Sequence, residues 1–95
     1  ALVLLHGGAG SWKHWIRNIP HLAASRTVWA PDLPGLGDSA DAPEPRDHDA
    51  IATVLAENLR ELVPGESFDL VGFSFGGIVA GFVAAKLPGR VRSLV

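Results

Sequence analysis

A serine between glycines is the feature of this sequence with the clearest chemistry. The run Gly72-Phe73-Ser74-Phe75-Gly76-Gly77 follows an apolar stretch and matches the pattern G-x-S-x-G. In this pattern a sharp turn from strand to helix holds the serine in a strained backbone conformation, so that its hydroxyl projects from the top of a sheet. Glycine is needed two positions before and after the serine, because a Cβ there would collide with the returning backbone. The sequence therefore predicts a nucleophilic serine at position 74.

The elements that must position this serine alternate between strands and helices. Short apolar runs predict strands at residues 2–5, 27–30, 68–73 and 91–95, with helical spacing of apolar residues between them. Such alternation is typical of parallel β-α-β construction. We therefore expect an α/β fold in which a parallel sheet of about four strands has helices on both faces.

The first two helical segments have recognisable ends. Ser11 is expected to cap the first segment, and Pro20 to divide it into two short pieces, because proline lacks an N–H and clashes with the preceding turn. Asp47 or Asp49 is expected to cap the second helix, which Pro64-Gly65 ends.

The third helix, from Phe75 to Leu87, is apolar on nearly every side. A helix with this pattern is predicted to be buried. Four aromatic residues are also predicted to belong to the core, namely Trp15, Trp29, Phe68 and Phe82.

Composition and charge exclude several classes of function. The net charge of −2 comes with no basic cluster, so nothing indicates nucleic acid or an anionic membrane as a partner. The absence of cysteine excludes disulfides, thiolate metal sites and a cysteine nucleophile. No apolar run approaches the roughly 18 residues of a membrane span. Neither a metal nor an organic cofactor is expected, because no ligand cluster or phosphate-binding fingerprint is present.

Both ends of the chain lie within apolar runs that read as strands. A length of 95 residues with 47% hydrophobic content suits one small domain or part of a larger one. We expect residues 1–95 to be an incomplete domain, cut at both ends. Expressed alone, such a piece should be poorly soluble or associate, because its last strand lacks a covering neighbour. The oligomeric state and the compartment stay open, with the cytoplasm favoured.

Three segments together carry a resemblance to a known family. They are Leu4-Leu5-His6-Gly7-Gly8, the turn Asp32-Leu33-Pro34-Gly35-Leu36-Gly37-Asp38-Ser39, and the run around Ser74. In order and separation they resemble the serine-nucleophile branch of the α/β-hydrolase superfamily. The resemblance spans nearly the whole chain and is similar to the N-terminal core of that fold, from its third to its sixth strand.

The resemblance implies a role for several residues. Ser74 matches the nucleophile, which forms an acyl-enzyme once a histidine takes its proton. Phe75 and Gly8 match the positions whose backbone N–H groups form the oxyanion hole, with Ala9 as the alternative to Gly8. The family's acid and histidine follow the serine in chain order, so they are expected beyond residue 95.

Each histidine is expected to have a role other than general base. His6 resembles the histidine that orders the glycine loop in this family. His14 and His21 are expected on the polar side of a helix, in solvent, and His48 at the surface after a loop.

Two aspartates are expected to have a structural role, and two aromatic residues are candidates for substrate binding. Asp32 and Asp38 are expected to fix their turn by accepting backbone N–H groups. Trp12 and Phe73 are candidates for substrate binding, although a core or packing role is open for both.

A serine at position 74 also bears on the reaction. It disfavours resemblance to haloalkane dehalogenases and epoxide hydrolases, which use an aspartate there, and the lack of cysteine disfavours the dienelactone type. We expect hydrolysis of a small-molecule ester or a related acyl carbonyl. C–C bond, lactone or thioester hydrolysis and cofactor-free peroxidation share all these motifs. A hydrolase-fold module that binds a ligand or a partner without catalysis is the alternative from another class.

Overall fold

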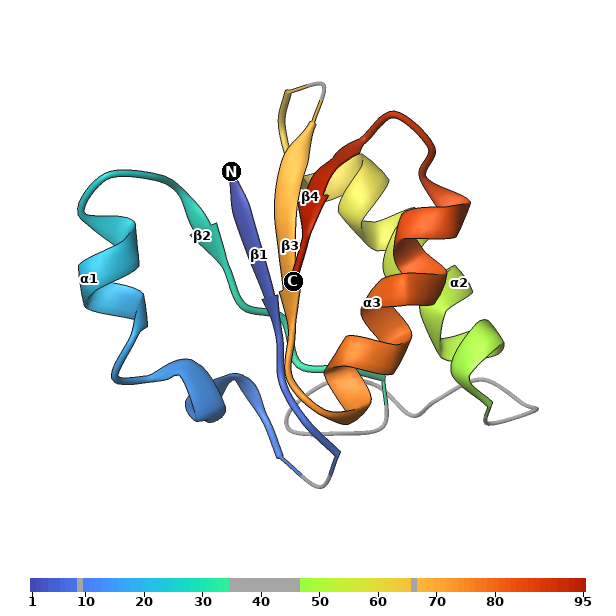
Figure 1. Cartoon of the computed structure of the whole chain (residues 1–95), viewed down its shortest axis with the longest axis horizontal. Coiled ribbons are helices and arrows are strands. Elements are labelled where there is room, and N and C mark those ends of the chain that lie inside the picture. Colours follow the sequence, from blue (N-terminus) through green and yellow to red (C-terminus); the bar gives the residue numbers. More distant parts are fainter. Residues whose placement is uncertain (9, 35–46, 66) are drawn as a thin grey trace.

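The computed structural model describes residues 1–8, 10–34, 47–65 and 67–95. Within these residues, four strands form one sheet in the order β2-β1-β3-β4, and every ladder is parallel (Figure 1). This arrangement confirms the predicted α/β class and its parallel sheet. The strands are β1 (Leu2–Leu5), β2 (Val28–Trp29), β3 (Phe68–Gly72) and β4 (Val91–Leu94).

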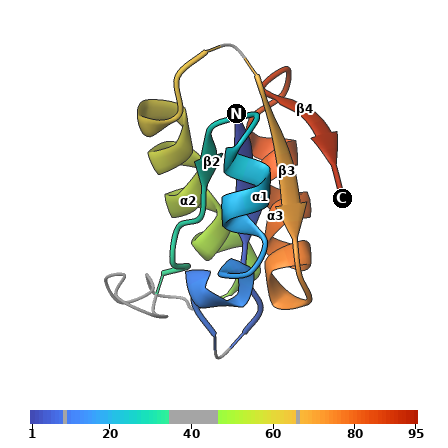
Figure 2. The ribbon, with the colours of Figure 1, turned by 90° about the vertical axis from the view of Figure 1, so that its left-hand side faces the viewer.

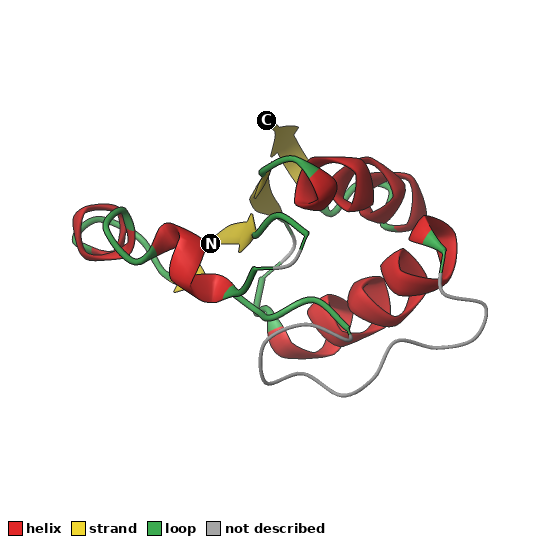
Figure 3. Ribbon diagram, turned by 90° about the horizontal axis from the view of Figure 1, so that it is seen from below, coloured by secondary structure: helices red, strands yellow, loops and turns green. Residues whose placement is uncertain are grey.

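Helices cover both faces of the sheet, as predicted. The 3-10 helix η1 (Trp12–Trp15) and the helix α1 (Ile19–Ala23) lie on one side of the strands. The longer helices α2 (His48–Leu62) and α3 (Phe75–Lys86) lie on the other side and pack against each other (Figures 2 and 3). The two central strands therefore lie between two helical layers.

The predicted helix ends are confirmed at three places. Ser11 caps η1, with its Oγ accepting from the Lys13 N–H at 3.3 Å. Pro20 lies in the first turn of α1, where a helix needs no N–H from it, so the segment forms two short pieces. Asp47, rather than Asp49, caps α2 by accepting from the Ala50 N–H at 2.7 Å.

The core lies between the sheet and the pair α2 and α3. All four residues of β1 are buried, as expected for a central parallel strand covered on both faces. Phe68 of β3 is also buried, which confirms its predicted place in the core, while Trp29 packs against the core and is partly buried. Among the other core residues are Leu33, Ile51, Leu55, Leu59, Leu70, Val79 and Val83.

The predicted burial of α3 on nearly every side is wrong. In the described structure only one stripe of α3 is buried, and Ile78 and Phe82 are 50% and 40% exposed. Phe82 is therefore not a core residue but stacks on the ring of His48 at 6.2 Å. A helix presents only one face to the sheet and α2, so uniform apolarity does not mean uniform burial.

One buried polar residue interrupts the apolar sheet. Asp69 on β3 is 7% exposed and accepts hydrogen bonds from Arg26, Arg92 and Ser93. The Arg92 contacts are 2.6 and 3.0 Å, and the Ser93 hydroxyl donates at 2.7 Å. These hydrogen bonds, with that of Arg92 the strongest, hold the pKa of the Asp69 carboxyl well below its ordinary range. The buried charge is thus stabilised by side chains of β4 and of the segment before β2.

Candidate active site

The glycine loop and the serine turn leave the sheet side by side. Strands β1 and β3 are hydrogen-bonded neighbours, with Leu5 paired to Gly72 at their carboxyl ends. The Phe73 N–H extends this pairing by donating to the Leu5 oxygen at 3.0 Å. A Cβ placed on Gly8 would lie 3.4 Å from the Phe75 Cβ, so the two chain segments touch just beyond the sheet.

Ser74 has the backbone conformation that the sequence predicts. Its φ of 55° and ψ of −117° make it the single non-glycine residue with positive φ in the described part of the chain. It stands between β3 and α3, is exposed to solvent, and its carbonyl accepts from Gly77 and Ile78 at 2.8 and 3.2 Å. A non-glycine residue in this region is strained and persists only where the surroundings fix it. The predicted tight strand-to-helix turn is therefore confirmed.

The glycines around Ser74 are required by close backbone contacts. A Cβ on Gly72 would lie 2.4 Å from the Gly76 oxygen, and one on Gly76 would lie 2.3 Å from the His6 oxygen. Gly77 is less crowded, with the Gly72 oxygen at 3.3 Å. The predicted collisions at Gly72 and Gly76 are confirmed, and they let the start of α3 lie against the glycine loop.

Two backbone N–H groups at this junction have no acceptor in the described part of the chain. They belong to Gly8 and to Phe75, the first residue of α3. The first N–H groups of a helix lack an internal partner and carry its positive dipole end. Such a pair can stabilise an anion. Ala9, the alternative donor, lies outside the described residues.

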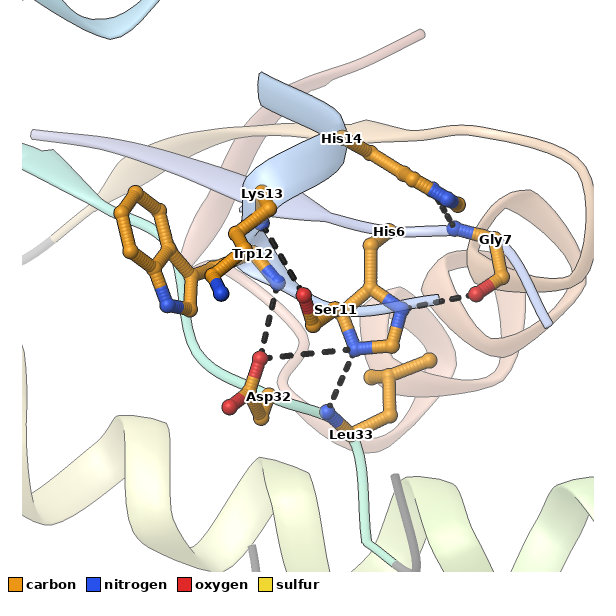
Figure 4. Close-up of polar contacts among 8 residues, drawn as sticks. All are labelled: His6, Gly7, Ser11, Trp12, Lys13, His14, Asp32 and Leu33. Atoms are coloured by element: carbon orange, nitrogen blue, oxygen red, sulfur yellow. Dashed lines mark hydrogen bonds and ion pairs between the residues drawn. The ribbon is translucent and has the colours of Figure 1, made fainter. Parts of the chain in front are cut away.

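His6 orders the glycine loop, as expected. It is fully buried, and its Nε2 accepts from the Leu33 N–H at 2.9 Å while its Nδ1 donates to the Gly7 oxygen at 2.7 Å (Figure 4). Because one ring nitrogen accepts and the other donates, the hydrogen bonds assign the neutral Nδ1–H tautomer. Both ring nitrogens are thus engaged in joining the loop after β1 to the segment after β2.

Asp32 accepts a backbone N–H, as predicted, but this N–H belongs to another segment and not to the turn of Asp32 itself. Its Oδ1 accepts from the backbone N–H of Trp12 at 2.7 Å and lies 3.9 Å from His6 Nε2 (Figure 4). The carboxylate therefore joins the chain after β2 to the first residue of η1. Asp38, predicted to act in the same way, lies outside the described residues.

His14 and His48 are exposed, as expected, and both also make contacts at the site. Nδ1 of His14 accepts from the Gly7 N–H at 3.1 Å, and its ring meets that of Phe73 edge-on at 5.9 Å. His48 packs against Phe75 at 5.2 Å. These contacts could not be predicted from the sequence, because they depend on how separate segments come together. His21 is exposed, as expected.

The aromatic candidates for substrate binding differ in their surroundings. Phe73 is 56% exposed and lines a cavity of about 260 Å³ together with His14, Trp15 and Asn18. Trp12 is partly buried and lines neither this cavity nor a second one of about 330 Å³ between the segment after β2 and α2. The binding role of both residues stays a prediction.

No histidine hydrogen-bonds to Ser74 within the described residues, and its hydroxyl has no protein partner there. The same residues contain no group of three His, Asp or Glu side chains that could hold a metal ion. Their helices are also too short or too polar to cross a membrane. The described part of the site thus consists of a hydroxyl, two amides and the side chains that orient their loops.

Comparison with known proteins identifies the family. The family described as alpha/beta hydrolase fold matches residues 1–95. The chain belongs to the α/β-hydrolase family. A solved member, the epoxide hydrolase CorEH without ligand, superposes with a TM-score of 0.89 at 40% identity, over 98% of this chain and 32% of that one.

Two curated relatives of this α/β-hydrolase chain come from Pseudomonas. It is 46% identical over 94 residues to the dihydrolipoyllysine-residue acetyltransferase component of the acetoin cleaving system of Pseudomonas putida, covering 98% of this chain and 25% of that protein. It is 41% identical over 100 residues to the 2-hydroxymuconate semialdehyde hydrolase of Pseudomonas sp. (strain CF600), and the match covers 99% of this chain and 34% of that protein. The chain therefore spans between a quarter and about a third of the length of these relatives.

Proposed function

We propose that the protein containing these residues is a serine hydrolase of a small carboxylic ester or a related acyl carbonyl compound. Ser74 attacks the carbonyl carbon to form an acyl-enzyme, which water then hydrolyses. The observation that carries this proposal is the exposed Ser74 in its positive-φ turn, adjacent to an amide N–H that has no acceptor in the described residues. Backbone strain of this kind persists at functional sites.

The amides of Gly8 and Phe75 are proposed as the oxyanion hole. Attack on a carbonyl moves negative charge onto its oxygen, and two fixed N–H donors stabilise that charge without reorganising. The contact between the two segments, 3.4 Å from a Cβ on Gly8 to that of Phe75, supports a shared target for both donors. Removal of one such donor in other enzymes lowers turnover by about 10²–10³-fold.

The general base is proposed to come from residues outside this chain. The resemblance implies that an acid and then a histidine follow the serine in sequence. The engagement of both His6 ring nitrogens with backbone groups supports this assignment, because a base needs a nitrogen that can receive the serine proton. We accordingly propose that residues 1–95 are one part of a larger catalytic domain.

Acyl carbonyl chemistry is favoured over epoxide opening, one of the reactions named among the relatives. Those names include a semialdehyde hydrolase, an epoxide hydrolase and an acetyltransferase component. A serine at position 74, where the epoxide hydrolases of this fold use an aspartate, supports attack on a carbonyl. Ester, lactone and C–C bond hydrolysis all begin with that attack, so the shared chemistry defines the proposed substrate class.

A fluorophosphonate probe tests the proposal on the full-length protein. Such a probe phosphonylates an activated serine, so the wild type should be labelled and Ser74→Ala should not. Ser25→Ala is the matched control, because Ser25 is an exposed serine just after α1, and it should be labelled like the wild type. Labelling that persists in Ser74→Ala would exclude Ser74 as the nucleophile. A folded wild type that takes no label would favour the non-catalytic binding module.

A further inference from the structure

We propose that His14 is a positioning residue for the oxyanion hole, because its Nδ1 is the acceptor that fixes the Gly7 amide. The Gly7 N–H donates to this nitrogen at 3.1 Å (Figure 4). The inference rests on the proposed function, since the orientation of the loop affects catalysis only if Gly8 donates to the reacting oxygen. His14 itself touches no reacting atom.

Two successive peptide units lead to the Gly8 amide, and a histidine holds each of them. In the unit between His6 and Gly7, the N–H donates to His14 while the carbonyl lies against Gly76. In the unit between Gly7 and Gly8, the carbonyl accepts from His6 Nδ1 at 2.7 Å. A trans peptide unit is planar and its C=O and N–H point in opposite directions. Fixing these two planes therefore sets the direction of the Gly8 N–H.

The imidazole of His14 is held in place by its neighbours. A Cβ on Gly10 would lie 2.2 Å from both Cε1 and Nε2 of this ring, so the ring occupies the space of a side chain at position 10. On another side the ring of Phe73 meets it edge-on at 5.9 Å. The three atoms nearest to a Cβ on Gly10 all belong to the His14 ring, so alanine at this position would act by displacing His14.

The acceptor role requires an unprotonated Nδ1. A protonated imidazole donates from both nitrogens, so it would face the Gly7 N–H with another donor. Among the described residues, Gly10 and Phe73 contact the ring and Trp15 and Asn18 line the same cavity, and all four are uncharged. The titratable neighbours are His6, whose ring meets that of His14 edge-on at 5.9 Å, and Lys13, the adjacent residue of η1. The hydrogen bond from Gly7 therefore assigns the acceptor form to Nδ1 of His14.

Paired substitutions of His14 in the full-length protein separate the acceptor from the bulk of the ring. His14→Asn places a non-titrating oxygen near the position of Nδ1, whereas His14→Leu fills the space without an acceptor. We expect His14→Leu to lower kcat for p-nitrophenyl acetate and the rate of fluorophosphonate labelling by about 10- to 100-fold, with little change in KM. His14→Asn should stay near the wild type, as should the control His21→Asn in the exposed part of α1.

A double-mutant cycle gives a further readout. Gly10→Ala should reproduce the loss seen in His14→Leu, and the double variant should be no slower than either single variant, because both remove one interaction. If His14→Leu does not fold, Gly10→Ala compared with His14→Asn carries the test.

The outcomes distinguish this inference from the proposed function. If the wild type is labelled and both His14→Leu and Gly10→Ala react as fast as the wild type, the positioning role is overturned. Ser74 then remains the proposed nucleophile. Equal loss in His14→Asn and His14→Leu would also overturn it, because then the acceptor atom is not what matters. A folded but unlabelled wild type would remove the proposed function and the positioning role together.

Discussion

The α carbon of Gly76 lies directly against the carbonyl group of His6. A Cβ built on Gly76 would come within 2.3 Å of the His6 oxygen and 2.4 Å of the Leu5 oxygen. Both oxygens belong to the backbone of β1 and the loop that follows it, so neither can rotate away as the end of a side chain could. The absence of a side chain at position 76 therefore lets the first turn of α3 lie beside the glycine loop.

Gly76→Ala should destabilise the protein and separate the two segments. The added methyl group forces backbone to move, and overpacking of this kind costs about 1–3 kcal/mol of unfolding free energy. Urea denaturation of the full-length protein measures the loss, and fluorophosphonate labelling should slow in parallel because Gly8 and Phe75 move apart.

Gly81→Ala is the matched control on the same helix. Gly81 is exposed, and a Cβ there meets nothing within 4 Å. Alanine should therefore stabilise α3 by about 0.5–1 kcal/mol through its higher helix propensity. Equal stability of Gly76→Ala and the wild type would contradict the close contact described above.

Replacing Ser74 by glycine should raise stability while abolishing labelling. Glycine adopts a φ of 55° without the strain that Cβ imposes, whereas Ser74→Ala keeps the Cβ and loses only the hydroxyl. We expect Ser74→Gly to be more stable than Ser74→Ala by about 1 kcal/mol in the same denaturation assay. The reverse order of stability would show that the turn is not strained at this position.

The strand-to-helix turn at Ser74 could be predicted from sequence because its requirements are local. Glycines at positions 72 and 76 and a serine between them specify one turn, and the adjoining strand and helix follow from short patterns. The exposed face of α3 could not be predicted, since residues such as Phe82 leave the helix without a distinct polar side. The contact between His14 and Gly7 depends on where η1 lies relative to the glycine loop after β1, and no local pattern specifies that position.

The buried ion pairs of Asp69 could not be predicted either, because the partners of this residue come from distant positions in the sequence. Arg26 is 43 residues away in sequence and Arg92 is 23. Their contacts arise because β3 pairs with β4 and because the segment that leads into β2 brings Arg26 to Asp69. A buried carboxylate of this kind is determined by strand register rather than by any motif.

The ion pairs of Asp69 should make stability depend on pH at the acid end. The pKa of this carboxyl is lowered in the folded protein, chiefly by Arg92 and then by Arg26 and Ser93, from an ordinary value of 3.8. A lowered folded-state pKa stabilises the fold above the unfolded-state value, and the contribution is lost as pH falls below it. The melting temperature of Asp69→Asn should therefore lie well below that of the wild type at neutral pH. The difference between the two melting temperatures should narrow below about pH 4.

Asp49→Asn is the control for this pH effect. Asp49 pairs with Lys86 at 2.7 Å, but its side chain is 65% exposed, so solvent screens the pair. Its replacement should change the melting temperature little at either pH. A gap between Asp69→Asn and the wild type that stays constant from neutral to acid pH would rule out the ionised carboxylate as its source.

Asp32→Ala should slow labelling and lower stability, although Asp32 lies on a different segment from Ser74. Its Oδ1 accepts from the Trp12 N–H at 2.7 Å and so holds η1, which carries His14, to the chain after β2. A partly buried N–H left without its acceptor costs about 1–3 kcal/mol. Denaturation and fluorophosphonate labelling of the full-length protein should both report the change.

Asp32→Asn separates the hydrogen bond from the charge at this position. The asparagine oxygen can still accept from Trp12, whereas the negative charge 3.9 Å from His6 Nε2 is lost. If the hydrogen bond is what holds η1, Asp32→Asn should recover most of the stability and labelling rate that Asp32→Ala loses. Equal losses in the two variants would instead assign the effect to the charge, because a carboxylate beside His6 is the feature that both remove.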